Sequence, residues 1–331
     1  MRYITYLCDV AHVRAKAPHH RAAAAPDFRL RKQNHQLRWD MRSVWAILVV
    51  LPVLSLSIAS GHSAPAYHEK RQLSSDLELG GDLAGLPPGS TRYITRDELL
   101  ALPQVRFTVE DDSNFTGPTR IDGIKLEDLA RPVGASSAAS MVVAICDDGY
   151  RAYYPHSYIT AHHPVLVLNV NEQPPIGWPK DAHDHSFDMG PFMISHQHFS
   201  PSFKVLSHVD EAQIPWGVVR IEFREEKVVF DAIGPRGPQA RDRRVQDGFR
   251  IAQQNCFRCH NSGSEGGQKS GRSWKLLSAL AGKSPEYFSG YIRDPVAKNP
   301  HAQMPANPQY DDATLGALTA YFKAFSQPAK P

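Results

Sequence analysis

The chain has 331 residues and a mass of 36.8 kDa, enough for about two domains at the usual ~150 residues per domain. Hydrophobic residues make up 42% and charged residues 21%, which excludes a wholly disordered chain, a collagen, a coiled coil and a multi-span membrane protein. The net charge of +3 comes from the first 66 residues, because 31 acidic residues outnumber 28 basic ones from Tyr67 onward, and the chain is not expected to bind nucleic acid.

Residues 1–66 are predicted to be a leader. The apolar run Val44–Ala59 has the length of a signal-peptide core and is shorter than the ~20 residues of a membrane span. Ala64-Pro65-Ala66 has the form of a cleavage site, with cleavage after Gly61 and retention of the run as a membrane anchor as alternatives. Met41 is the expected start of translation, since residues 1–40 show no periodic pattern. The leader predicts export to the periplasm of a bacterium.

The remaining chain is predicted to contain two domains. Residues 67–90, rich in Ser, Gly, Pro and mixed charge, are expected to be a linker, and residues 91–233 an α+β domain. In this domain Thr95–Glu98 is a capping box that begins a short helix, and Lys125–Ala130 has helical spacing. Its strands are predicted at Val105–Val109, Met141–Ile145, Val165–Val170 and Val218–Phe223. Residues 234–240 are expected to be a hinge, and residues 241–326 an all-α domain.

Four short motifs follow one another in the α+β domain. They are the "DG-x-x-L-x-D-L" run Asp122–Leu129, the turn Asp147–Tyr150, the segment Met189–Phe192 and the run Ile214–Ile221. This order resembles the molybdopterin-binding domain of the sulfite oxidase superfamily. That family places a cysteine ligand of molybdenum upstream of the first motif, where residues 110–120 contain none, and Cys146 is expected to be a buried apolar thiol. Molybdopterin is therefore not expected, and the domain is interpreted as a scaffold.

The C-terminal domain contains the C-x-x-C-H motif Cys256-Phe257-Arg258-Cys259-His260. In an exported chain this spacing predicts one covalent haem c, with two thioether links and His260 as an iron ligand. A thioredoxin-type redox pair would need a preceding strand, and a zinc site would need a second pair of ligands downstream. Haem attachment is therefore the favoured interpretation.

The residues around this motif resemble class I cytochromes c. Gly248 and Phe249 precede it, Met304-Pro305 follows it, and an apolar run over Ala313–Phe325 closes the domain. The resemblance implies that Met304 is the distal iron ligand and that the domain transfers electrons. Core packing of Met304 and ligation by His301 remain alternatives. The carbonyl that orients His260 is left open, because no Gly-Pro turn follows the motif.

A second candidate metal site consists of two His-x-His pairs, His183 with His185 and His196 with His198. On adjacent strands each pair would place both imidazoles on one face, which suits copper or zinc. The alternative interpretation is that these histidines are solvent-exposed polar residues of a loop and bind no metal.

The sequence supports two main hypotheses for function. In the first, an exported monohaem cytochrome relays single electrons between periplasmic redox proteins or a membrane electron-transfer chain, and the chain is not an enzyme. In the second, residues 91–233 catalyse an oxidation or reduction and the haem of Cys256 and Cys259 is the built-in electron acceptor or donor. A third, weaker hypothesis makes the histidine pairs a metal-binding module with the haem as a sensor.

Overall fold

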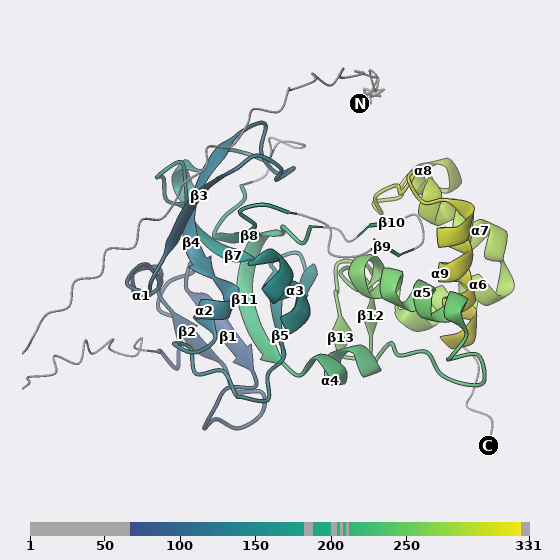
Figure 1. Ribbon diagram of the computed structural model, residues 1–331, viewed down its shortest axis with the longest axis horizontal. Helices are drawn as coiled ribbons and strands as arrows, with labels where there is room; N and C mark the ends of the chain where they lie inside the picture. Colours follow the sequence, from purple (N-terminus) through teal and green to yellow (C-terminus); the bar gives the residue numbers. More distant parts are fainter. Residues whose placement is uncertain (1–66, 182–187, 200–203, 206–207, 210–211, 326–331) are drawn as a thin grey trace, which may run out of the picture. The chain divides into compact units, whose positions relative to one another are not determined.

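The computed structural model describes residues 67–181, 188–199, 204–205, 208–209 and 212–325, which are coloured in Figure 1. All of these residues belong to one compact unit that spans Gly61–Pro331. The leader expected over residues 1–66 lies outside the described residues. We divide the described part into a sheet domain, residues 67–233, and a helical domain, residues 241–325.

Nine of the described strands form one mixed sheet in the sheet domain (Figure 1). Seven strands follow the order β2-β1-β11-β8-β7-β4-β3, while β5 pairs with β11 and with β6. The pair β1 and β11 is parallel, and the other described pairs of this sheet are antiparallel. The strands are β1 (Leu77–Gly81), β2 (Arg92–Ile94), β3 (Val105–Val109), β4 (Thr119–Lys125), β5 (Met141–Cys146), β6 (Arg151–Pro155), β7 (Val165–Val170), β8 (Phe192–Ser195) and β11 (Trp216–Arg224).

The elements predicted in this domain are present. β3 and β7 have the predicted bounds, and β5 and β11 contain the predicted runs. The capping box is formed, because the Thr95 hydroxyl accepts the N–H of Glu98 and the Glu98 carboxylate accepts the N–H of Thr95. The other segments are α1 (Arg96–Leu100), α2 (Leu126–Leu129), α3 (His156–His162), the 3₁₀ turn η1 (Pro175–Gly177) and α4 (Glu226–Asp231), with the two-residue strands β9 (Lys204–Val205) and β10 (His208–Val209). The α+β class is therefore confirmed.

The expectation that residues 67–90 form a linker is corrected by the structure. Part of this segment is β1, which pairs with both β2 and β11 inside the sheet. Leu77 and Leu79 are fully buried on one face of β1, so the short run contributes two core residues despite its polar surroundings. A strand of five residues with only two apolar side chains is too short a signal to stand out from a Gly- and Ser-rich composition.

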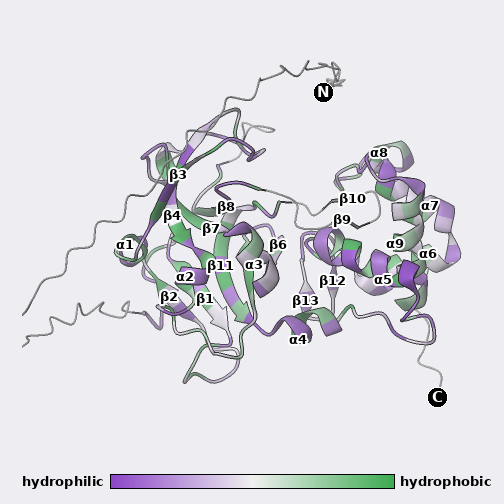
Figure 2. Ribbon diagram, viewed as in Figure 1, coloured by the Kyte–Doolittle hydropathy of each residue, from purple (hydrophilic) through white to green (hydrophobic). Residues whose placement is uncertain are grey.

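The helical domain consists of four longer helices and several short elements. α5 (Arg243–Ile251) runs into a π-helical turn, η2 (Ala252–Cys256), and a small β-hairpin of β12 (Asn261–Ser262) and β13 (Glu265–Gly266) follows. The chain continues with α6 (Trp274–Lys283), α7 (Pro285–Arg293), α8 (Pro295–Lys298) and α9 (Asp312–Phe325). Figure 2 shows mainly hydrophilic residues on α5 and more hydrophobic ones on α9. The buried residues of α9 include Leu315, Leu318, Tyr321 and Phe322.

The two domains share a hydrophobic core. Successive side chains of a strand point to opposite faces, and β5 uses both faces. Val142, Ala144 and Cys146 belong to the core of the sheet domain, whereas Met141 and Val143 pack with the apolar residues of the helical domain. On β6, Tyr153 also faces the helical domain, and its ring is stacked on Phe257 with centroids 5.0 Å apart. The segment 234–240 therefore joins two domains that are in direct contact.

None of the helices in the described part of the chain is both long and apolar enough to span a bilayer.

Gly248 provides a test of the packing of α5 on α9. A Cβ atom added to Gly248 would overlap the carbonyl of Ala317 and the side chain of Tyr321. Helix propensity alone predicts that alanine stabilises a helical glycine position by up to about 1 kcal/mol. We expect the opposite for Gly248→Ala, a loss of about 1–3 kcal/mol in the free energy of unfolding, because the close backbone approach must open.

Gly282→Ala is the matched control, since a Cβ at Gly282 in α6 would meet no atom within 4 Å. Denaturant unfolding followed by circular dichroism would compare the two variants. If Gly248→Ala were as stable as the wild-type protein or more stable, this packing would be contradicted.

Candidate haem site

The C-x-x-C-H motif lies where α5 ends. Asp242 begins this helix, because its carboxylate accepts the N–H groups of Arg244 and Val245. The π-helical turn Ala252–Cys256 then widens the helix, and π turns of this kind are frequent at functional sites. The N–H groups of Cys259 and His260 both donate to the carbonyl of Cys256, at 3.2 and 3.0 Å. This tight turn brings the three chemically active side chains of the motif to one cavity.

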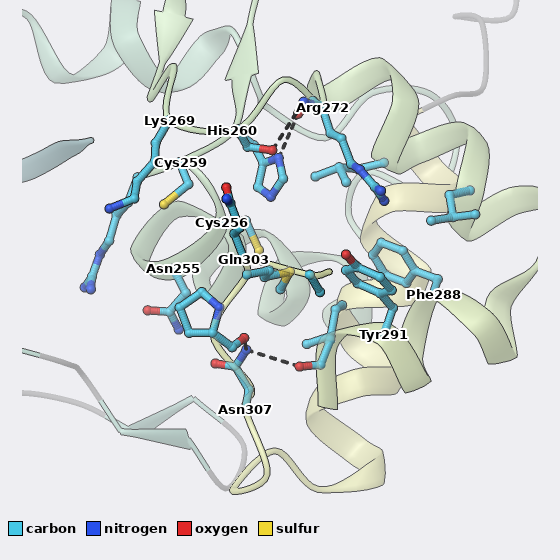
Figure 3. A pocket seen from close by; sticks show the side chains of 18 of the residues that line it. Asn255, Cys256, Cys259, His260, Lys269, Arg272, Phe288, Tyr291, Gln303 and Asn307 are labelled. Carbon is cyan, nitrogen blue, oxygen red and sulfur yellow. Dashed lines mark hydrogen bonds between the residues drawn. The ribbon is translucent and has the colours of Figure 1, made fainter. Parts of the chain in front are cut away.

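This cavity has a volume of about 710 Å³, and nearly all of the residues that line it belong to the helical domain. Figure 3 shows Cys256, Cys259 and His260 on one side of it, and Phe288 and Tyr291 of α7 on the other. Its apolar wall is completed by residues from three helices, Leu277, Leu280, Ile292 and Phe322. A largely apolar cavity of this size with a few polar groups is typical of a site for a bound organic molecule.

The geometry of His260 answers the question that the sequence left open. Its Nδ1 lies 2.7 Å from the backbone carbonyl of Arg272, just before α6 (Figure 3). Because that carbonyl can only accept, Nδ1 carries the proton and Nε2 is left as the metal-binding nitrogen. Burial lowers the pKa of His260, which favours the neutral imidazole that a metal requires.

Both candidates for the distal ligand line the same cavity. Met304 is partly buried and packs against the core of the helical domain. His301, three residues earlier, is exposed, although it also contributes to the lining. The loop that carries them is held by Asn307, whose amide donates to the carbonyl of Ile292 at 3.2 Å. The apolar setting suits the soft thioether of Met304 better than an imidazole that water can reach.

Positively charged side chains also reach the cavity. Arg258 of the motif lines it together with Lys269 and Arg272 from the loop that follows. The guanidinium of Arg272 lies 5.3 Å above the ring of Tyr291. Carboxylates pair favourably with such groups, above all with the planar fork of arginine.

These residues fit a covalently bound haem c. Cys256 and Cys259 form no disulfide, so both sulfurs remain available for thioether links. The imidazole, the thioether, the apolar wall and the nearby cations are the donor set and surroundings that a haem with two carboxylate groups needs. Four of these residues were predicted from the sequence, Cys256, Cys259, His260 and Met304. The structure brings all four to the same cavity.

Cys146 was expected to be a buried apolar thiol, and this is confirmed. It lies at the end of β5 with 5% of its surface exposed, inside the core of the sheet domain. Burial raises the pKa of its thiol far above the usual range, so the group stays protonated.

The histidine pairs give a different result. His183 and His185 lie outside the described residues. His196 and His198 follow the end of β8, and only His196 is buried, whereas 77% of the His198 side chain is exposed. This corrects the expectation that both imidazoles share one face of a strand. Within the described part of the chain, no group of three or more His, Cys, Asp and Glu side chains could hold a metal ion.

His196 belongs to the packing of the sheet domain. Its Nε2 lies 3.2 Å from the hydroxyl of Tyr158, and its ring packs edge-on against Phe199. Burial lowers the pKa of His196 to about 3, so the ring is neutral at physiological pH. These contacts describe a hydrogen-bonded core histidine.

Two features of the cavity were not predicted from the sequence. The group that holds His260 is the backbone carbonyl of Arg272, and a sequence pattern cannot show which backbone carbonyl will lie near a side chain. Tyr150, in the turn between β5 and β6, lines the cavity although it belongs to the other domain. It was noted only as part of a motif, because nothing in a single sequence reports a contact between segments a hundred residues apart.

The comparisons with known proteins agree with this geometry for one part of the chain. Residues 243–322 match the family model described as "Cytochrome C oxidase, cbb3-type, subunit III". No curated protein matches the chain. Among solved structures, the sulfane dehydrogenase SoxCD from Paracoccus pantotrophus is similar with a TM-score of 0.33 and 14% identity, over 52% of this chain and 45% of that chain. This likeness transfers no activity, substrate or cofactor to the present protein.

The family match covers the C-x-x-C-H motif, α6, α7 and most of α9, which are the elements that enclose the cavity. Residues 243–322, which make up most of the helical domain, are therefore a cytochrome c domain.

Proposed function

We propose that the protein is an exported electron-transfer protein that holds one haem c in its helical domain and uses its sheet domain as a fixed scaffold. The observation that carries this proposal is the cavity shared by Cys256, Cys259, His260 and Met304. A haem attached there exchanges single electrons, because its iron changes between the ferrous and ferric states.

Each of these residues has a distinct role in the proposal. The sulfurs of Cys256 and Cys259 would form the thioether links, and His260 would bind the iron through Nε2 while the carbonyl of Arg272 holds its Nδ1. Met304 would supply the second protein ligand, and its soft thioether would favour the ferrous state. If His260 and Met304 both bound the iron, the protein would supply both of its ligands, and the haem would provide electron relay rather than a site for substrate.

The sheet domain supports the scaffold role through its cysteine. Cys146 is the sequence's one cysteine between residues 67 and 255, and its thiol is protonated and enclosed by the core. The resemblance to the sulfite oxidase superfamily implies a cysteine thiolate as the molybdenum ligand, and a thiol enclosed by the core of the sheet domain does not provide one.

The alternative is a periplasmic oxidoreductase whose sheet domain carries catalysis. It is favoured by the direct packing of β5 and β6 on the cytochrome domain, which would give a short path for electrons. In both proposals the leader supports export, and the partners are periplasmic redox proteins or a membrane electron-transfer chain.

Elemental analysis separates the two proposals. We expect full-length protein, matured in a bacterial periplasm, to contain one iron per chain and no stoichiometric molybdenum or copper. Molybdenum at one atom per chain would contradict the scaffold role and favour the oxidoreductase.

Removal of the thiols tests covalent attachment. We expect the double variant Cys256→Ala, Cys259→Ala to lose all covalently bound haem, because it has no sulfur that can form a thioether. Haem staining after denaturing electrophoresis measures this loss. The control Cys146→Ala should keep the stain, since Cys146 does not line the cavity. A stained double variant would exclude the proposed attachment.

The distal ligand can be tested by spectroscopy. We expect Met304→Ala to lose the weak red absorption band of methionine bound to ferric iron and to show a lower reduction potential, because a harder ligand favours ferric iron. The control His301→Ala should keep both properties. An unchanged spectrum of Met304→Ala, or absence of the band from the wild-type protein, would exclude Met304 as the ligand.

A further inference from the structure

The turn between β5 and β6 of the sheet domain is bonded directly to the haem-attachment motif. The N–H of Arg151 donates to the carbonyl of Arg258 at 2.9 Å, and the N–H of Gln268 donates to the carbonyl of Gly149 at 2.8 Å. Asp148 adds an ion pair with Lys269. The two backbone hydrogen bonds, one at Arg151 and one at Gly149, fix this turn against the motif and against the segment that follows it.

Gly149 allows this close approach. Its φ of +83° lies in the region that favours glycine, and a Cβ there would meet the backbone of Gln268 and Lys269 at 3.1–3.2 Å. The residue after it, Tyr150, is thereby directed to the cavity, which it lines beside Arg258 and Cys259.

The surroundings of Tyr150 define its chemical state. The cationic guanidinium of Arg258 lies close enough to interact electrostatically with the Tyr150 side chain. Burial raises the pKa of Tyr150, so the side chain is a neutral phenol at physiological pH. The half-buried ring of Tyr150 covers the part of the cavity wall beside Arg258 and Cys259, and an aromatic ring at such a place reduces the access of water.

We propose that Tyr150 is a haem-pocket residue supplied by the sheet domain, which closes the pocket to water beside Cys259 and so raises the reduction potential of the haem. This inference rests on the proposed function, because it assigns the sheet domain a defined part in the electron-transfer site. Ferric haem carries one more positive charge than ferrous haem, and water stabilises that charge. Excluding water and holding the Arg258 cation near the pocket both favour the ferrous state.

The test is the reduction potential of the full-length holoprotein, measured by redox titration in an optical cell. We expect Tyr150→Ala to shift the potential to lower values and to speed reduction by ascorbate, because the pocket opens to solvent. Tyr150→Phe keeps the ring and should keep most of the original potential. Tyr93→Ala, which removes a partly buried tyrosine of β2 outside the cavity, should leave the potential unchanged.

Tyr150→Leu gives the same test if the alanine variant does not fold, since leucine fills less of the opening and lacks the ring. Equal potentials in wild type, Tyr150→Leu and Tyr150→Ala would overturn the role of Tyr150, and so would an equal shift in Tyr93→Ala. Failure of the proposed function is recognised separately, because wild-type protein would then carry no covalent haem.

Discussion

The stacking of Tyr153 on Phe257 is the contact on which much of this structure depends. Phe257 lies between the two cysteines of the C-x-x-C-H motif and is fully buried. It contacts Tyr153 and Phe230 of the sheet domain on one side and the edge of Trp274 on the other. The residue that spaces the two thiols is therefore also the residue that joins the domains. Each large aromatic ring buried at such a junction contributes on the order of a few kcal/mol, so the geometry of the motif and the packing of the domains stabilise each other.

Elements with a strong local signal could be predicted from the sequence. β3 and β7 are runs of apolar and β-branched residues, the capping box begins α1, and the final helix is one residue longer than expected. β1 could not be predicted in the same way, because its place is set by parallel pairing with β11, about 140 residues later in the chain. The prediction that His196 and His198 share one face was wrong for a related reason. Residues two apart lie on the same face only within a strand, and β8 ends at Ser195.

The residues of the candidate site also fall into those that the sequence could predict and those that it could not. Cys256, Cys259, His260 and Met304 could be found because the spacing of the motif and the Met-Pro pair carry the chemistry in the side chains themselves. The contributions of Arg272, through a carbonyl, and of Tyr150, through a turn in the other domain, exist only in the folded chain. The odd and even residues of β5 show why: both sets are apolar, and the sequence does not say which core each set enters.

The burial of Cys259 has a consequence for how the protein is made. Thioether formation requires a reactive sulfur, and burial raises the pKa of the Cys259 thiol, which keeps it in its less nucleophilic form. The same thiol lines the cavity together with Tyr150 of the β5–β6 turn, which is fixed by the hydrogen bond between Gly149 and Gln268. The sulfur is thus most reactive in a chain whose sheet domain has not yet closed over the motif. If haem is attached at Cys259 as proposed, attachment is expected to be easier before the sheet domain packs on the motif than after it.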